Sequence, residues 1–195
     1  MKKNTFYIIG IIFLIISFFI DGKVSLFFSS IRNETFNSIS FFISYINTIS
    51  LFVITTLILY LIKKRKEIIL MWAAFFISGV ASLVIKLLTE RTRPFVEFGF
   101  DAIHGINFDF AIWNSSFPSW HAAALFVVYP FLNKKIRYYW IAFALIVIVN
   151  RVYTGFHYLS DVVFGALLGI FIADLVPYLL KCYNRKVYKH LLTLK

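Results

Sequence analysis

Long apolar runs separated by short polar or basic turns constrain the fold of this chain more than any other feature. Such runs cover Phe36 to Ile62, Ile68 to Leu88 and Tyr158 to Leu180. Of the 195 residues, 61% are hydrophobic and only 15% are charged, and the mean hydropathy is +0.82. A water-soluble domain of this length cannot bury so much apolar surface. We therefore expect an all-α, polytopic membrane protein.

The order of the runs predicts six transmembrane helices in one bundle, formed by a single domain over residues 1–195. The expected spans are Phe6–Ile20, Phe36–Ile62, Ile68–Leu88, Ser119–Leu132, Tyr138–Val152 and Tyr158–Leu180. We expect the first run to be a span and not a signal peptide, because no small-residue cleavage site follows it. Asp21-Gly22-Lys23 is expected to break this helix, which either ends there or continues as Val24–Ile31.

Two further patterns refine this bundle. Gly165 and Gly169 form a small-xxx-small face in the last span, which is suited to close packing against another helix. The loop between the third and fourth helices is rich in aromatic residues: Phe95, Phe98, Phe100, Phe108, Phe110, Trp113 and Phe117. A long loop of this kind is typical of a functional segment or of an interfacial belt at the membrane surface.

The charge distribution predicts the orientation in the membrane. The chain has 20 basic and nine acidic residues, and basic residues flanking membrane spans explain this excess better than nucleic-acid binding does. With six spans, 14 lysines and arginines lie on the side of both termini and six on the opposite side. We therefore expect a multi-pass protein of the cell membrane with cytoplasmic termini. The single cysteine, Cys182, excludes an intramolecular disulfide.

Polar residues that a membrane would otherwise reject gather at span ends on the outer, extracytoplasmic face. Lys86 and Arg93 are seven residues apart and are expected on one face of the third helix, with Arg91 on another face at head-group level. Ser119, Trp120 and His121 open the fourth helix, whose free N–H groups suit an anion.

Arg151, His157 and Asp161 bracket the last turn on the same outer face. Cations outnumber carboxylates among these residues, which is the reverse of a metal site. The pattern therefore predicts a phosphate site without a metal or other cofactor. Two histidines in such a site can act as nucleophile and as general acid.

The three segments resemble the signature of the type 2 phosphatidic acid phosphatase superfamily, K-x6-RP, PSGH and SR-x5-H-x3-D. Here they read Lys86-x6-Arg93-Pro94, Pro118-Ser119-Trp120-His121 and Asn150-Arg151-x5-His157-x3-Asp161. The resemblance implies that His157 is the nucleophile, that Asp161 binds its other ring nitrogen, and that His121 is the general acid. It further implies a phosphate-binding role for Lys86, Arg93, Ser119, Arg151 and the backbone amide of Trp120.

The sequence departs from this signature at two positions. Trp120 replaces the family glycine, and Asn150 replaces the family serine. We expect the Trp120 side chain to point away from the phosphate, where it either narrows the pocket or changes the substrate class. Asn150 is the milder change, because its amide can still form hydrogen bonds.

The resemblance implies a membrane phosphatase that hydrolyses a lipid phosphate or diphosphate, such as a polyprenyl diphosphate or a phosphatidic-acid-like lipid, through a phosphohistidine. The expected partner is therefore a lipid in the bilayer and not a nucleic acid. Two alternatives stay open at this point. The protein could transfer the phospho group or head group to another alcohol, or it could be a non-catalytic component for lipid binding or transport.

Overall fold

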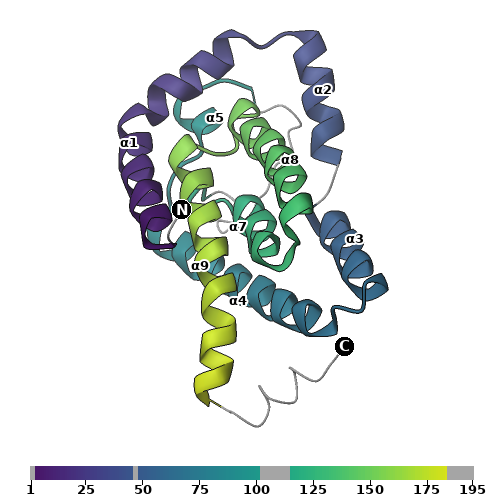
Figure 1. Cartoon of the computed structure of the whole chain (residues 1–195). Coiled ribbons are helices and arrows are strands. Elements are labelled where there is room, and N and C mark those ends of the chain that lie inside the picture. Colours follow the sequence, from purple (N-terminus) through teal and green to yellow (C-terminus); the bar gives the residue numbers. More distant parts are fainter. Residues whose placement is uncertain (1–2, 46–47, 102–114, 184–195) are drawn as a thin grey trace.

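The structure, a computed structural model, describes residues 3–45, 48–101 and 115–183, and these ranges contain helices but no strands. Figure 1 shows the arrangement. The elements are α1 (Lys3–Ser30), α2 (Glu34–Tyr45), α3 (Thr48–Leu61), α4 (Arg65–Thr89), α5 (Pro94–Glu97), α7 (Trp120–Val128), the 3₁₀ turn η1 (Tyr129–Phe131), α8 (Lys134–Tyr153) and α9 (Leu159–Tyr183). The aromatic loop lies partly outside the described residues, so its expected form is not tested.

Four stretches within the described ranges are long and apolar enough to cross a membrane. They are Asn4–Ser30, Arg65–Glu97, Lys134–Tyr153 and Leu159–Cys182. Leu51–Leu61 and Trp120–Phe131 are apolar but shorter. The prediction of a helical membrane protein is thus confirmed, whereas the number of six spans stays a prediction.

One expectation about the first half of the chain, the break at Asp21-Gly22-Lys23, is wrong. Helix α1 runs through Asp21-Gly22-Lys23 without a break. Asp21 fits inside a long helix because its buried carboxylate accepts hydrogen bonds from α9. Within the expected second span the structure describes α2 and α3; residues 46–47 between them lie outside the described ranges, so the continuity of this span is not tested.

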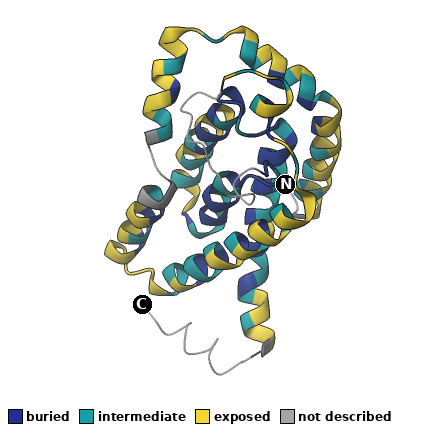
Figure 2. Cartoon of the chain, turned by 180° about the vertical axis from the view of Figure 1, so that it is seen from behind, coloured by how far each residue is buried: buried dark blue, intermediate teal, exposed yellow. Residues whose placement is uncertain are grey.

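Helix α7 lies at the centre of the bundle, where buried residues concentrate (Figure 2). Ala122, Ala123 and Ala124 are all fully buried. On α9, a Cβ atom added to Gly165 would lie 2.4 Å from Ser119 O, and one added to Gly169 would lie 2.2 Å from Ala123 O. The predicted close packing through the two glycines is therefore confirmed, because any larger side chain would meet the backbone of α7.

Large apolar side chains cover the outside of the bundle. Phe19 on α1, Leu88 on α4 and Tyr139 on α8 are each about four-fifths exposed, at 82%, 80% and 79%. In Figure 2 the exposed residues concentrate on the outward faces of the peripheral helices. A surface of this kind is stable in contact with lipid but not with water.

Candidate active site

The site lies where α4 ends, α7 begins, α8 ends and α9 begins. Helix α4 stops at Thr89 because Glu90 adopts a left-handed conformation, with φ 44°, and its N–H bonds to Lys86 O. The seven-residue spacing predicts that Arg93 lies on the same helical face as Lys86. This prediction is wrong, because the helix ends before Arg93. Arg93 lies beyond the end of α4 in extended backbone and is the N-cap residue of α5. The chain between the two helices brings it to the site.

His157 lies in the turn between α8 and α9 and is only 5% exposed. Its Nδ1 is 2.8 Å from the backbone oxygen of Ser116. A carbonyl oxygen can only accept, so Nδ1 carries the hydrogen and Nε2 keeps its lone pair. Burial lowers the pKa of His157 well below 6.5, and the positive charges of Arg93, Lys86 and Arg151 lower it further. The ring is therefore neutral at pH 7.

Asp161 does not form the expected hydrogen bond with His157. Its Oδ2 is 3.6 Å from His157 Nδ1 and instead accepts the backbone N–H of Tyr158 at 2.8 Å. An acidic side chain in the first turn that accepts an N–H just before the helix is a capping contact. Asp161 thus fixes the turn that carries His157, whereas Ser116 fixes the tautomer.

The three predicted phosphate-binding cations all lie within electrostatic range of His157. Lys86 Nζ donates to Ser115 O at 2.6 Å, and Arg93 Nη1 donates to Phe156 O at 2.8 Å. Arg151 Nε is buried and has no hydrogen-bond partner within the described ranges. These two hydrogen bonds of Lys86 and Arg93 are to backbone oxygens, and three cations gathered in this way can bind a multiply charged anion.

The first turn of α7 supplies the second predicted segment. Ser119 is fully buried and is the N-cap residue of α7; its Oγ accepts the N–H of Ala122. Its own N–H donates to the backbone oxygen of Asp161 at 3.0 Å, which ties the start of α7 to the start of α9. His121 lies within electrostatic range of His157 and of the three cations. All eight predicted residues thus belong to segments that meet at this end of the bundle.

The structure shows where Trp120 and Asn150, the two departures from the signature, lie. The Trp120 side chain lies between α7 and α4, with its ring 5.7 Å from that of Phe75 and its Nε1 3.5 Å from a Cβ built on Gly79. Asn150 is buried and donates to Ser40 O at 3.3 Å and to Ser44 Oγ at 3.0 Å. The Asn150 amide therefore joins α8 to α2, whereas Trp120 lines the groove described below.

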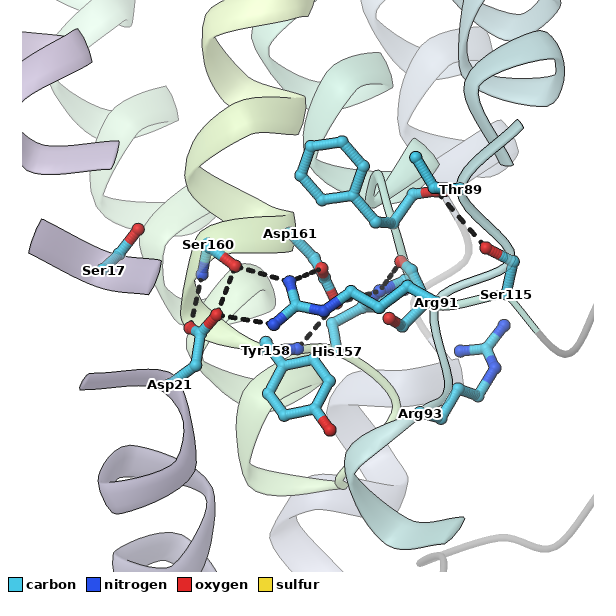
Figure 3. Close-up of polar contacts among 12 residues, drawn as sticks. Ser17, Asp21, Thr89, Arg91, Arg93, Ser115, His157, Tyr158, Ser160 and Asp161 are labelled. Carbon is cyan, nitrogen blue, oxygen red and sulfur yellow. Dashed lines mark hydrogen bonds and ion pairs between the residues drawn. The ribbon is translucent and has the colours of Figure 1, made fainter. Parts of the chain in front are cut away.

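Two residues of this region were missed by the sequence analysis. Arg91 was expected at head-group level, but its Nη1 donates to Asp161 Oδ1 and its Nη2 to Asp21 Oδ2, both at 2.8 Å (Figure 3). Asp21 was read only as a helix breaker. A carboxylate within an apolar run is itself a signal of function. Its partner could not be inferred, because the two residues are 70 positions apart.

Comparison with known proteins yields several matches. The sequence model of the PAP2 superfamily matches residues 67–185. The bacitracin transport permease protein BcrC of Bacillus licheniformis is 30% identical over 114 residues, which are 55% of this chain and 53% of that protein. Phosphatidylglycerophosphatase B of Bacillus subtilis is 30% identical over 139 residues, 64% of this chain and 62% of that protein. The matches thus span little more than half the length of these relatives.

Two crystal structures have the same fold. A transmembrane PAP2-type phosphatidylglycerolphosphate phosphatase from Bacillus subtilis superposes with a TM-score of 0.66 at 23% identity, covering 91% of this chain and 97% of that one. LpxE of Aquifex aeolicus gives a TM-score of 0.62 at 20% identity, with coverages of 79% and 92%. The family match covers more than half of the chain and includes all three motifs, and on these grounds the protein belongs to the PAP2 superfamily.

Proposed function

We propose that this protein hydrolyses a lipid phosphate or lipid diphosphate through a phosphohistidine on His157. The observation that carries the proposal is the state of the His157 ring. Its Nδ1 donates to Ser116 O, and three cations surround the buried neutral imidazole. A neutral imidazole with a free Nε2 lone pair is a nucleophile, and cations attract the phosphoryl group to it.

The reaction then has two steps. Nε2 attacks phosphorus, and the N–P bond forms as the bond to the leaving oxygen breaks, while His121, which takes up a proton when the negatively charged phosphate is bound beside it, gives that oxygen this proton. In the second step His121 takes a proton from water, the water oxygen attacks phosphorus, and the N–P bond breaks to release inorganic phosphate. Lys86, Arg93 and Arg151 stabilise the charge on the phosphoryl oxygens in both steps. The free N–H groups at the start of α7 assist them.

An apolar groove supports a lipid as the substrate. The groove has a volume of about 450 Å³ and runs along α4 from Phe75 and Phe76 past Val80 and Leu83 to Lys86. Its wall on the α7 side is Trp120. Lys86, a proposed phosphate-binding residue, thus lines one end of the groove. The other lining residues are apolar except for Ser82. A lipid whose phosphate binds at Lys86 would place its hydrocarbon chain in this groove.

The names of the relatives fit a lipid substrate but do not decide which one. The Bacillus subtilis relative and the Bacillus subtilis crystal structure are both named as phosphatases of phosphatidylglycerophosphate, whereas BcrC is named as a transport permease. We place the proposed site on the extracytoplasmic side, because 14 of the 20 basic residues lie on the other side in the six-span topology.

The first experiment measures phosphate release by the detergent-solubilised protein in EDTA. Phosphatidylglycerophosphate, phosphatidic acid and a polyprenyl diphosphate are compared side by side. We expect release from at least one lipid, loss of release in His157→Gln, and inhibition by inorganic vanadate. Activity that persists in His157→Gln would overturn the mechanism. Binding of vanadate without turnover of any lipid would favour the non-catalytic alternative, and a phosphorylated added alcohol would indicate transfer.

The second experiment tests the groove with a matched pair of substitutions. Val80→Trp fills the groove beside Trp120, and Ile146→Trp fills a different apolar groove, of about 430 Å³, between α2 and α8. We expect Val80→Trp to lower hydrolysis of the long-chain lipid but not of a short soluble phosphate ester. Ile146→Trp should change neither. Equal effects of the two variants on the lipid would contradict a tail-binding role for the α4 groove.

A further inference from the structure

Helix α1 places a buried carboxylate beside the candidate site. Asp21 is 4% exposed and lies within a candidate membrane span, outside the residues 67–185 that match the family. A carboxylate in such a position is destabilising unless charge and hydrogen bonds compensate it. Asp21 therefore needs partners, and each partner that the structure gives it comes from the segments that build the site.

Both carboxylate oxygens of Asp21 are bonded. Oδ1 accepts the backbone N–H of Ser160 at 2.9 Å. Oδ2 accepts from the Ser160 hydroxyl and from Arg91 Nη2, the latter at 2.8 Å. Asp21 thus binds the first turn of α9 and the chain between α4 and α5 at the same time.

Arg91 connects Asp21 to Asp161. Its guanidinium lies between the two carboxylates in Figure 3, with Nη1 donating to Asp161 Oδ1 at 2.8 Å and to Ser160 Oγ at 2.7 Å. The guanidinium also lies over the Tyr158 ring, 4.0 Å from its centroid. It is also 5.4 Å from the centroid of the Phe18 ring, so two carboxylates and two aromatic faces fix the direction of this side chain.

The network ends at the backbone that carries His157. Asp161 Oδ1 is held by Arg91, and Oδ2 accepts the N–H of Tyr158, the residue directly after His157. A displacement of Asp161 would move this turn and with it the His157 ring. A shift on the order of 1 Å can reduce the rate of a positioned reaction by roughly 100-fold.

We propose that Asp21 is a positioning residue for the reaction at His157, acting through Arg91 and Asp161. Its charge holds the Arg91 guanidinium in the one orientation that bridges both carboxylates, so that Asp161 keeps the His157 turn in place. Asp21 does not contact the substrate in this proposal. The proposal rests on the phosphohydrolase function proposed above.

The test compares Asp21→Asn with Tyr7→Phe. Asparagine keeps an acceptor for Ser160 but removes the charge that orients Arg91. Tyr7→Phe removes a different polar link between α1 and α9, the 2.7 Å bond to Asp174, which lies 14 residues away from the Asp21 contact on each helix. We expect kcat of Asp21→Asn to fall by roughly 10- to 100-fold while KM and the binding of inorganic vanadate stay near wild type. Tyr7→Phe should retain the wild-type kcat.

A double mutant identifies the route of the effect. If Asp21 acts through Arg91, the variant Asp21→Asn with Arg91→Gln should be no slower than Arg91→Gln alone. Wild-type kcat in Asp21→Asn, an equal loss in Tyr7→Phe, or losses that multiply in the double variant would each overturn the proposal. An inactive wild-type protein would instead reject the phosphohydrolase function itself.

A second variant covers the case in which Asp21→Asn does not fold. Arg91→Lys keeps the positive charge but has a single nitrogen, which cannot bridge two carboxylates in the same way. We expect the same selective loss of kcat in Arg91→Lys. Wild-type kcat in this variant would overturn the proposal.

Discussion

Helices α1 and α9 contact each other through polar groups at two levels, and the two contacts differ in character. At one level the Tyr7 hydroxyl donates to Asp174 Oδ2 at 2.7 Å. At the other, Asp21 bonds to Ser160 and to Arg91, which in turn bonds to Asp161. Fourteen residues separate the two levels on each helix, which corresponds to about 21 Å along the axis.

The two contacts differ in the neighbouring groups to which they are connected. The Tyr7–Asp174 bond has an aromatic neighbour, Phe171, whose ring centroid is 6.4 Å from that of Tyr7. The Asp21 contact includes the chain between α4 and α5 and leads to the turn of His157. The same pair of helices thus uses a hydrogen bond for packing at one end and a charged network for the candidate site at the other. Substitutions at the two ends should separate activity from stability.

The largest effect is expected at His157. Removing the nucleophile by His157→Gln should lower lipid phosphate hydrolysis by at least about 1,000-fold, because the proposed covalent route is lost. The unfolding midpoint in mixed micelles should stay close to that of wild type. Phosphate release by the two proteins at equal concentration measures the effect. Less than a tenfold loss would mean that the two ends of α9 do not differ in function as we infer.

The next largest effect is expected from a substitution in the region of α9 between the two contacts. Gly169→Ala should destabilise the fold by about 1–3 kcal/mol, since the new methyl group would lie in the backbone of α7. Gly79→Ala on α4 is the matched control, because its Cβ meets Trp120 Nε1 at an ordinary 3.5 Å. Denaturant titration of both variants checks this prediction. Equal stabilities would mean that α7 can move away from α9 at little cost.

A smaller effect should follow from pH at the His157 end. The pKa of folded His157 is lowered, mainly by burial and then by the nearby cations, so the unfolded chain binds a proton that the folded one does not. The stability that neutral His157 contributes is therefore present above about pH 6.5 and should fall by about 1 kcal/mol near pH 5.5. Titrations of wild type and His157→Gln at both pH values isolate this effect. The same pH dependence in both proteins would assign it to other groups.

The smallest effect is expected at the Tyr7 end. Tyr7→Phe should cost about 0.6 kcal/mol, the typical value of a hydrogen bond between membrane helices. Denaturant titration measures this loss, and kcat should be that of wild type. A lowered kcat in Tyr7→Phe would remove the contrast between the two ends, because it would show that any loosening of α1 reaches the site.

The sequence alone determined the class of the protein and singled out the segments of its candidate site. Its apolar runs are too long and too numerous for a soluble domain, and the helical membrane class followed from them. The spacing within the three motifs singled out His121 and His157 and the cations Lys86, Arg93 and Arg151. The glycine pair in α9 also predicted close helix packing correctly. These features are local in sequence, and short-range physics suffices to interpret them.

Tertiary structure decided which polar groups pair with one another. Helical periodicity failed for Arg91 and Arg93, because α4 ends at Thr89 and a left-handed residue redirects the chain. The sequence predicted that Asp161 would hold the His157 ring, but a backbone oxygen of Ser116, 41 positions away, holds it. Asp21 was expected to break α1, yet it joins α1 to Arg91 and Ser160. Hydrogen bonds between distant segments depend on positions that only the packed helices define.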